Sequence, residues 1–316
     1  AFAGARAAFP GVQVTPGAQC VETAQRGDLL RRGSGAAVRA GPEQQPASLQ
    51  RQRQPTAANT AVTSHALLRS ARPATMIFRQ LFDRESCTYT YLLGDEDTME
   101  AVLIDPVIEL VDRDTELLKE LGLELTYALN THVHADHITG TGELKQRWKN
   151  CKSVLGAEGN EKALADLKMA EGDVITVGKI NIETISTPGH TSGCHCYIVD
   201  TDATKMIFTG DVLLIRGCGR TDFQQGSSSD LYESIHGKVF TLPDDTIVYP
   251  AHDYKGRTMS TVGEEKKYNP RLTKSKDEFK DIMANLGLPY PAKIDVSLPA
   301  NLVCGLHELM PSETKA

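Results

Sequence analysis

The stretch Thr131-His132-Val133-His134-Ala135-Asp136-His137 places three imidazoles and one carboxylate within six positions. It follows directly after the apolar run of residues 125–129, which predicts a buried strand. On an extended turn, side chains two positions apart point the same way, so His132 and His134 can aim at one point while Asp136 and His137 face an adjacent one. Imidazole nitrogens and carboxylate oxygens are ligands that zinc and iron accept. The stretch therefore predicts a metal site, against the alternative of a polar turn that is merely rich in histidine.

Three further polar groups follow predicted strands in the same way. They are TPGHT at 187–191, TGD at 209–211 and PAHD at 250–253, after strands predicted at 180–185, 206–208 and 246–249. Loops at one end of a rigid sheet are where such folds carry their chemistry, so the four groups are expected to meet at one edge. Strands are also predicted at 89–93, 101–104 and 196–199, with a helix at 112–121 and another after 261. Strands followed by helices in two rounds indicate a layered α/β sandwich.

The charge of the chain is divided unevenly. Residues 1–75 hold nine Arg, no Lys and three acids, a net charge of +6, whereas the rest holds 25 bases against 38 acids, a net charge of −13. The net negative charge of residues 76–316 argues against nucleic acid as a partner, because binding phosphates needs a clustered basic surface. No apolar run approaches the roughly 18 residues that a membrane-spanning helix requires, so no membrane span is expected.

The arginine-rich part is predicted to be a targeting segment. Residues 1–75 are rich in Ala, Arg, Ser and Gln and lack sustained apolar periodicity, which is typical of an organellar transit peptide. An ordinary disordered tail or a wrongly placed start is the alternative. The domain boundary is placed near residue 75, with a catalytic domain at 76–316. Seven cysteines with no regular framework suit a reducing compartment.

The four motifs THVHADH, TPGH, TGD and YPAHD resemble the metallo-β-lactamase superfamily in order and spacing, over about residues 77–306. The resemblance implies an α+β fold, the αβ/βα sandwich of that superfamily, and it makes Asp105 look like the structural aspartate near the site. Within the superfamily, the segment RGCGRTDF at 216–223 is similar to the persulfide dioxygenases of mitochondrial sulfide oxidation. Further similar stretches are FRQLF at 78–82, NPRLT at 269–273 and PANLVCG at 299–305.

The resemblance implies one Fe(II) per chain, held by His132, His190 and Asp211, which leaves open positions for substrate sulfur and dioxygen. The side chains expected to orient the ligands and bound water are His134, Asp136, His137 and His252. The implied reaction oxidises glutathione persulfide with dioxygen and water to sulfite and glutathione. The side chains expected at the substrate are Arg220, whose fork pairs with carboxylates, and Thr221, Tyr254 and Cys304. The implied location is the mitochondrial matrix, and a plastid location and a homodimer both stay open.

Two other functions remain open at this point. A glyoxalase II-type enzyme would use two metals to hydrolyse a glutathione thioester with nearly the same residues, because the whole dinuclear set is present. The segment at 216–223 and the lack of an extended basic C-terminal region weigh against it. An inactive metal-binding or scaffold protein is disfavoured because no ligand position is missing. One departure from the family pattern is the pair His195-Cys196, where apolar or hydroxyl side chains are expected after Gly193-Cys194.

Overall fold

The first sheet is formed by the N-terminal half of residues 76–309, the part of the chain that the computed structural model describes. Its strands lie across the sheet in chain order: β1 (Met76–Phe82), β2 (Tyr89–Asp95), β3 (Glu100–Ile104), β4 (Glu124–Leu129), β5 (Lys152–Gly156) and β6 (Leu167–Met169). The first three strands pair antiparallel, and β3 to β6 pair parallel. The predicted targeting segment, residues 1–75, lies outside the described residues.

The second sheet takes its strands from the C-terminal half. They are β7 (Val174–Val177), β8 (Ile180–Ser186), β9 (His195–Asp200), β10 (Lys205–Gly210), β11 (Ile247–Pro250) and β12 (Ser260–Thr261), again in chain order across the sheet. Strands β7 to β10 are antiparallel, and β10 pairs parallel with β11. The turn from β10 and the turn from β11 therefore leave the sheet at the same edge.

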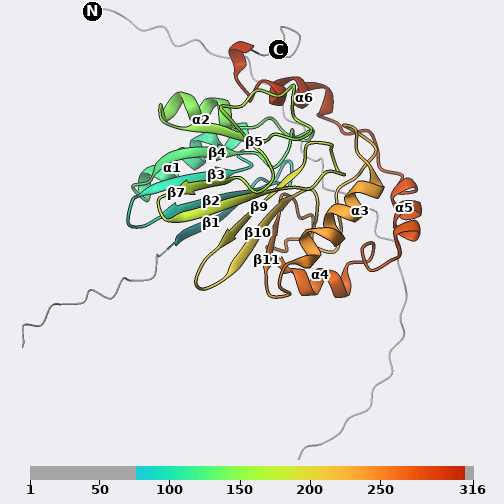
Figure 1. The fold of residues 1–316 in the computed structure, drawn as a ribbon. Coiled ribbons are helices and arrows are strands. Elements are labelled where there is room, and N and C mark those ends of the chain that lie inside the picture. Colours follow the sequence, from blue (N-terminus) through green and yellow to red (C-terminus); the bar gives the residue numbers. More distant parts are fainter. Residues whose placement is uncertain (1–75, 310–316) are drawn as a thin grey trace, which may run out of the picture. The chain divides into compact units, whose positions relative to one another are not determined.

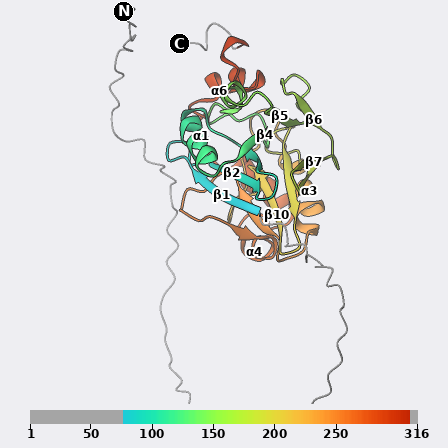
Figure 2. The same ribbon diagram turned by 90° about the vertical axis from the view of Figure 1, so that its left-hand side faces the viewer.

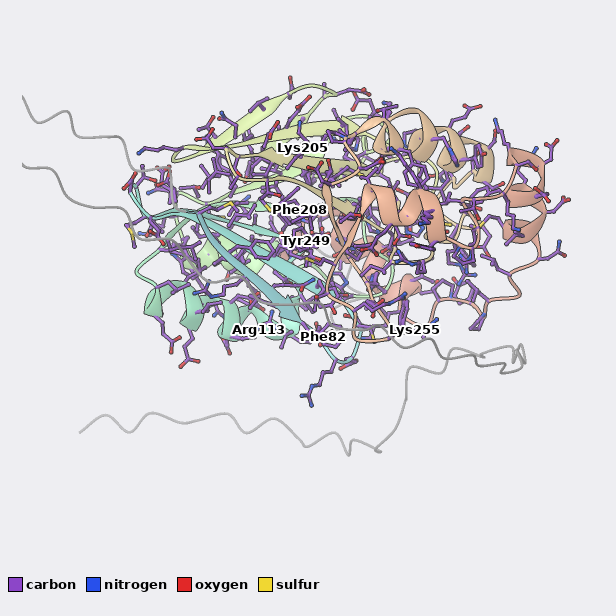
Figure 3. The ribbon with its side chains drawn as sticks, turned by 90° about the horizontal axis from the view of Figure 1, so that it is seen from below. Phe82, Arg113, Lys205, Phe208, Tyr249 and Lys255 are labelled. Atoms are coloured by element: carbon purple, nitrogen blue, oxygen red, sulfur yellow. The ribbon has the colours of Figure 1, made fainter. Side chains whose placement is uncertain are left out.

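The main core lies between the two sheets because alternate side chains of each strand face inward. In β2, Tyr91 and Leu93 face the second sheet, while Leu92 faces the helices outside the first. Phe208 and Tyr249 project from the second sheet into the same core, and Figure 3 shows them between the two sheets. Their rings stack with centroids 5.5 Å apart, an aromatic contact that adds to the burial of apolar area.

Helices cover the outer face of each sheet. Helices α1 (Val111–Glu120) and α2 (Thr141–Arg147) pack on the first sheet, and α3 (Ser228–Gly237), α4 (Val262–Tyr268) and α5 (Lys276–Ala284) pack on the second. Figure 1 shows the two groups of helices on opposite sides of the sheets. Helix α6 (Ile294–Leu302) lies at the end opposite α4 in both ribbon views (Figures 1 and 2). Short 3-10 turns occupy Ile108–Leu110, Val239–Thr241 and His307–Leu309. The αβ/βα sandwich is confirmed.

All seven predicted strands are present, each within two residues of its expected ends. The predicted helix at 112–121 is α1, and Gly122 after it has φ +68, as its position at the C-terminus requires. Thr261 caps α4 by accepting a hydrogen bond from Glu264 N. The Glu264 carboxylate pairs with Arg216. Among residues 76–309, no helix is both long enough and apolar enough to cross a bilayer.

Candidate metal centre

His132 is oriented by its neighbour Thr131. The Thr131 hydroxyl donates to Asp105 Oδ2 at 2.9 Å and lies 3.0 Å from His132 Nδ1. Because the hydroxyl proton is given to the carboxylate, Nδ1 of His132 is the donor in the second contact, and its Nε2 carries the lone pair. Asp105 Oδ1 also accepts from Thr131 N at 2.7 Å and contacts His134 Nε2 at 3.0 Å. Asp105 therefore holds the start of the histidine turn, which is the kind of structural role expected for it.

His190 is oriented by the segment that follows β10. Its Nδ1 donates to the Arg220 carbonyl oxygen at 2.7 Å, which leaves Nε2 to face Asp211 Oδ2 at 3.6 Å. Asp211 follows Gly210, whose φ is +52 and whose Cβ, if it had one, would lie 2.5 Å from Thr131 Oγ1. Only glycine fits this approach, and it brings Asp211 against the histidine turn.

His132, His190 and Asp211 form one group whose ligand atoms all lie within 4.8 Å of one another. Their side chains come from the ends of β4, β8 and β10. The His132 Nε2 and Asp211 Oδ1 atoms are buried and have no hydrogen-bond partner among the described residues. Buried polar atoms without a partner cost free energy, and an ion is one way to satisfy them. Two imidazoles and one carboxylate that converge in this way fit a divalent metal.

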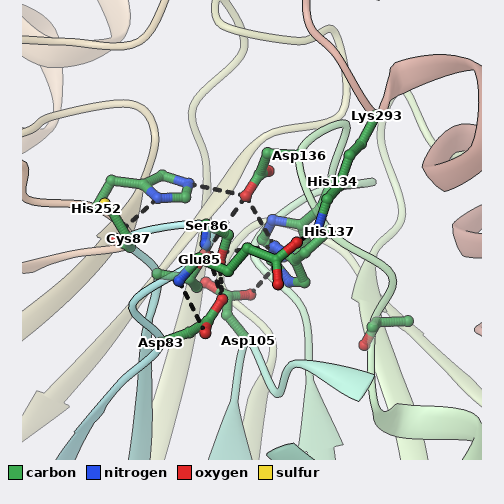
Figure 4. Close-up of polar contacts among 12 residues, drawn as sticks. Asp83, Glu85, Ser86, Cys87, Asp105, His134, Asp136, His137, His252 and Lys293 are labelled. Atoms are coloured by element: carbon green, nitrogen blue, oxygen red, sulfur yellow. Dashed lines mark hydrogen bonds and ion pairs between the residues drawn. The ribbon is translucent and has the colours of Figure 1, made fainter. Parts of the chain in front are cut away.

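A second group of possible ligands lies beside the first. It consists of His134, Asp136 and His137, and the His134 and His137 rings lie 4.4 Å apart. His252 joins the two groups, since its Nε2 lies 3.5 Å from both Asp136 Oδ2 and Asp211 Oδ1. Figure 4 shows His252 and His137 both directed at Asp136. The four polar turns predicted to meet at one edge do so.

The pKa values of the imidazoles in the cluster are shifted in different directions. Burial, followed by the charges of His134 and His190, holds the pKa of His132 well below its usual value, so this ring stays neutral and able to bind a metal. Burial alone would lower the pKa of His252, but the carboxylates of Asp211 and Asp136 outweigh it and raise that pKa. Burial opposes the ionisation of Asp136, yet His137 and His252 bring its pKa well below the ordinary value.

Asn301 holds the histidine turn in place, a role that the sequence does not indicate. Its side chain, from α6, accepts from Thr139 N at 2.8 Å and donates to the carbonyl oxygens of His134 and His137, each at 2.8 Å. One buried amide therefore holds both ends of the turn that carries the second group. Its partners are more than 160 positions away and are backbone groups, so no local pattern in the sequence marks this role.

The Arg220 guanidinium is already held in a fixed orientation. Its Nε and one terminal nitrogen bind the Asp222 carboxylate at 2.7 and 2.8 Å, its other terminal nitrogen binds Pro289 O at 2.8 Å, and the group lies 4.6 Å from the Phe223 ring centroid. The guanidinium carries five N–H donors, and these contacts use three. Two donors remain for a ligand.

The other predicted substrate residues lie in different surroundings. The half-exposed Tyr254 ring is nearly parallel to His252, with centroids 6.0 Å apart, and Thr221 is partly exposed next to Arg220. Cys304 is buried behind the histidine turn, where it lines a cavity of about 10 Å³ together with His132 and His134. Burial raises the pKa of its thiol.

A larger hollow of about 740 Å³ adjoins the site. Its lining includes Val133 and Thr191, which are direct neighbours of proposed ligands, and the apolar side chains Phe223, Leu298 and Leu302. Two residues of the lining are linked directly, because the Gln224 amide donates to Val133 O at 2.7 Å. The hollow therefore lies beside the turns that carry His132 and His190, and part of its lining is apolar.

Comparison with known proteins identifies the family of this chain. The model of the metallo-beta-lactamase superfamily matches residues 86–252, which hold all the proposed metal ligands. Persulfide dioxygenase ETHE1, mitochondrial, of Mus musculus is 55% identical over 238 residues, which cover 75% of this chain and 92% of the mouse protein. The chain belongs to the persulfide dioxygenase family. A crystal structure of ETHE1 from Myxococcus xanthus superposes with a TM-score of 0.69 at 52% identity, over 73% of this chain and 100% of that one.

Proteins named as hydrolases are less similar to this chain. A probable hydroxyacylglutathione hydrolase of Schizosaccharomyces pombe is 27% identical over 236 residues, which cover 65% of this chain and 89% of the yeast protein. The difference in identity favours the dioxygenase family over the thioester hydrolases, and the chain is an enzyme of the former type.

Proposed function

We propose that this chain oxidises the outer sulfur of glutathione persulfide with dioxygen at a single Fe(II) held by His132, His190 and Asp211. The observation that carries the proposal is the group of three convergent side chains, in which His132 Nε2 is buried without a hydrogen-bond partner among residues 76–309, in a chain of this family. Iron in such a set would supply a change of redox state and open positions for two reactants. Zinc offers no redox change, so it does not suit the reaction.

The protein's own contribution is orientation. Thr131 and the Arg220 carbonyl oxygen each engage an Nδ1 atom, which directs the Nε2 atoms of His132 and His190 into the site. Partners of this kind fix the tautomer and raise the basicity of a ligand. His134, Asp136, His137 and His252 are proposed to orient bound water and the Asp211 carboxylate, because His252 lies between the two carboxylates.

The peptide part of the substrate is proposed to lie against Arg220, Thr221 and Tyr254. Glutathione carries two carboxylates, and Arg220 keeps two N–H donors after its contacts with Asp222 and Pro289. Cys304 is the weakest member of the predicted set, because its thiol is buried and lines a cavity of only about 10 Å³.

We propose that residues 76–316 form the catalytic domain and that residues 1–75 direct the protein to the mitochondrial matrix. The mouse relative is named as mitochondrial. The arginine-rich composition of residues 1–75 suits that assignment.

A second candidate function is hydrolysis of a glutathione thioester with two metals. It is favoured by one observation, the second ligand group of His134, Asp136 and His137. Two metals in adjacent groups would supply a hydroxide for attack on a thioester.

One experiment separates the two functions. Protein purified under nitrogen is analysed for metals, and oxygen uptake and sulfite formation are then followed with glutathione persulfide. About one iron per chain, with oxygen consumption that disappears when zinc replaces iron, supports the dioxygenase. Two zinc ions per chain, no oxygen consumption and rapid hydrolysis of a glutathione thioester would establish the hydrolase instead.

A further inference from the structure

His195 is a fully buried imidazole that lies outside both groups of metal ligands. It begins β9, with its Nδ1 3.0 Å from Gly193 O and its Nε2 2.8 Å from Glu158 Oε2. A carbonyl and a carboxylate are both hydrogen-bond acceptors, so the ring lies between two acceptors, one at each nitrogen. The hydrogen bond from His195 lowers the pKa of Glu158.

Glycine makes the space for this ring. A Cβ atom on Gly156, the last residue of β5, would lie 1.9 Å from His195 Nδ1. The next turn of the chain is equally tight, because a Cβ on Gly159, whose φ is +75, would lie 2.1 Å from Ser192 O. Real Cβ atoms do not approach so closely. The segment 156–160 is therefore closely packed against the segment 192–195.

A buried amide strengthens the same junction. Asn160 Nδ2 donates to Gly193 O at 2.7 Å and to Gly156 O at 3.1 Å. Gly193 O thus accepts from both Asn160 and His195, three positions after the proposed ligand His190. This oxygen therefore links the turn that carries His190 to the loop that follows β5.

The backbone of His195 reaches the other metal-binding turn. Its N–H donates to Thr131 O at 2.9 Å, and the Thr131 hydroxyl contacts His132 Nδ1 at 3.0 Å. His195 therefore contacts the chain immediately before His132 with its backbone and the turn after His190 with its ring.

We infer that His195 and Glu158 are a positioning pair for the metal centre, which sets the relative placement of the turns that carry His132 and His190 and thereby the affinity for the metal. The inference rests on the proposed ligand set. It explains the departure at His195 from the apolar or hydroxyl side chain expected there. Removal of one partner leaves the other polar group without its hydrogen bond, which forces the junction to rearrange. Changes in side chains that orient metal ligands typically lower metal affinity by roughly 10- to 100-fold.

The test measures metal affinity in variants of the full chain. Glu158→Gln keeps the shape of the side chain and removes its charge, and His195→Phe keeps a ring and removes both N–H donors. Asp97→Asn, which breaks the exposed Asp97–Lys179 pair, is the matched control. Affinity for Co(II) and Fe(II) is measured by competition with a chelator at 25 °C, with circular dichroism to verify folding and thermal unfolding to record stability.

We expect Glu158→Gln to weaken Co(II) binding by about tenfold, since it alters a group that orients ligands, while Asp97→Asn leaves it unchanged. The double variant should lose little more metal affinity than either single variant, because the two changes remove one interaction.

A lower melting temperature with metal affinity unchanged would show that the pair is only structural and would overturn the inference. A loss of metal affinity in the double variant equal to the sum of the losses in the two single variants would also overturn it. Should His195→Phe not fold, Glu158→Gln alone decides, because the Glu158 side chain is about half exposed. Failure of the unaltered protein to consume oxygen would instead count against the proposed function.

Discussion

Replacement of Asn301 by Leu should destabilise the domain and loosen the histidine turn. The amide makes three buried hydrogen bonds, to Thr139 N and to the carbonyl oxygens of His134 and His137. Leucine has a similar branched shape but no polar atoms, so three backbone groups lose their partner. An orphaned buried group costs on the order of 1 kcal/mol or more, which gives a loss of about 3 kcal/mol for the three. A domain of this size has a total stability of roughly 5–15 kcal/mol, so the loss is large.

Urea unfolding of the metal-free protein measures this loss, and competition with a chelator measures the metal affinity. Asn301→Asp is a second variant, because it keeps the acceptor for Thr139 N and removes both donors. Asn285→Leu is the control, since the exposed Asn285 makes a single side-chain hydrogen bond to Asp281 O. A free-energy change below about 0.5 kcal/mol is expected for the control, as for most surface substitutions. A similarly small change for Asn301→Leu would refute the reasoning.

Three further outcomes are expected. Asp211→Asn should lower both iron content and oxygen uptake, measured on the same preparation, because the ligand group loses its carboxylate charge. Arg220→Ala should lower kcat/KM for glutathione persulfide by roughly 10- to 100-fold, as expected for a lost charge-assisted pair, with iron content near normal; unchanged kinetics would remove Arg220 from the substrate site. The buried thiols should resist a disulfide reagent at pH 8 in the native protein and react fully in denaturant, because burial raises the pKa of Cys151, Cys194 and Cys196 to about 12.

The sequence predicts seven of the strands, and it misses β1, β5, β6, β7 and β12. Strand β7, Val174–Val177, alternates exposed and buried residues over only four positions, too few to distinguish from a turn. Strand β12 has two residues and is defined by its pairing with β11. These elements owe their conformation to neighbouring strands, and a local pattern does not contain that information.

The site likewise has features that the sequence predicts and features that it does not. The convergence of the four polar turns could be predicted, because each turn follows a recognisable strand and parallel strands end at the same edge. The contacts that orient the ligands could not be predicted. His190 is oriented by a carbonyl oxygen of Arg220, and Asn301 acts on backbone groups far away in the chain. A backbone acceptor leaves no trace in the type of residue, so only the folded structure identifies it.

The segment at 216–223 acts on the metal group mainly through its backbone. Gly219 N donates to Asp211 O at 2.8 Å, and a Cβ at Gly219 would lie 2.4 Å from that oxygen and 2.8 Å from His190 Nδ1. The next residue supplies the carbonyl oxygen that orients His190. The segment therefore lies directly behind two of the three proposed ligands, and its glycine is required by that close approach. Because Arg220 follows in the same segment, the placement of the guanidinium is coupled to the placement of the ligands. One stretch of chain thus places two proposed ligands and the proposed substrate residue Arg220, which gives a physical reason why this stretch carries the resemblance to the persulfide dioxygenases.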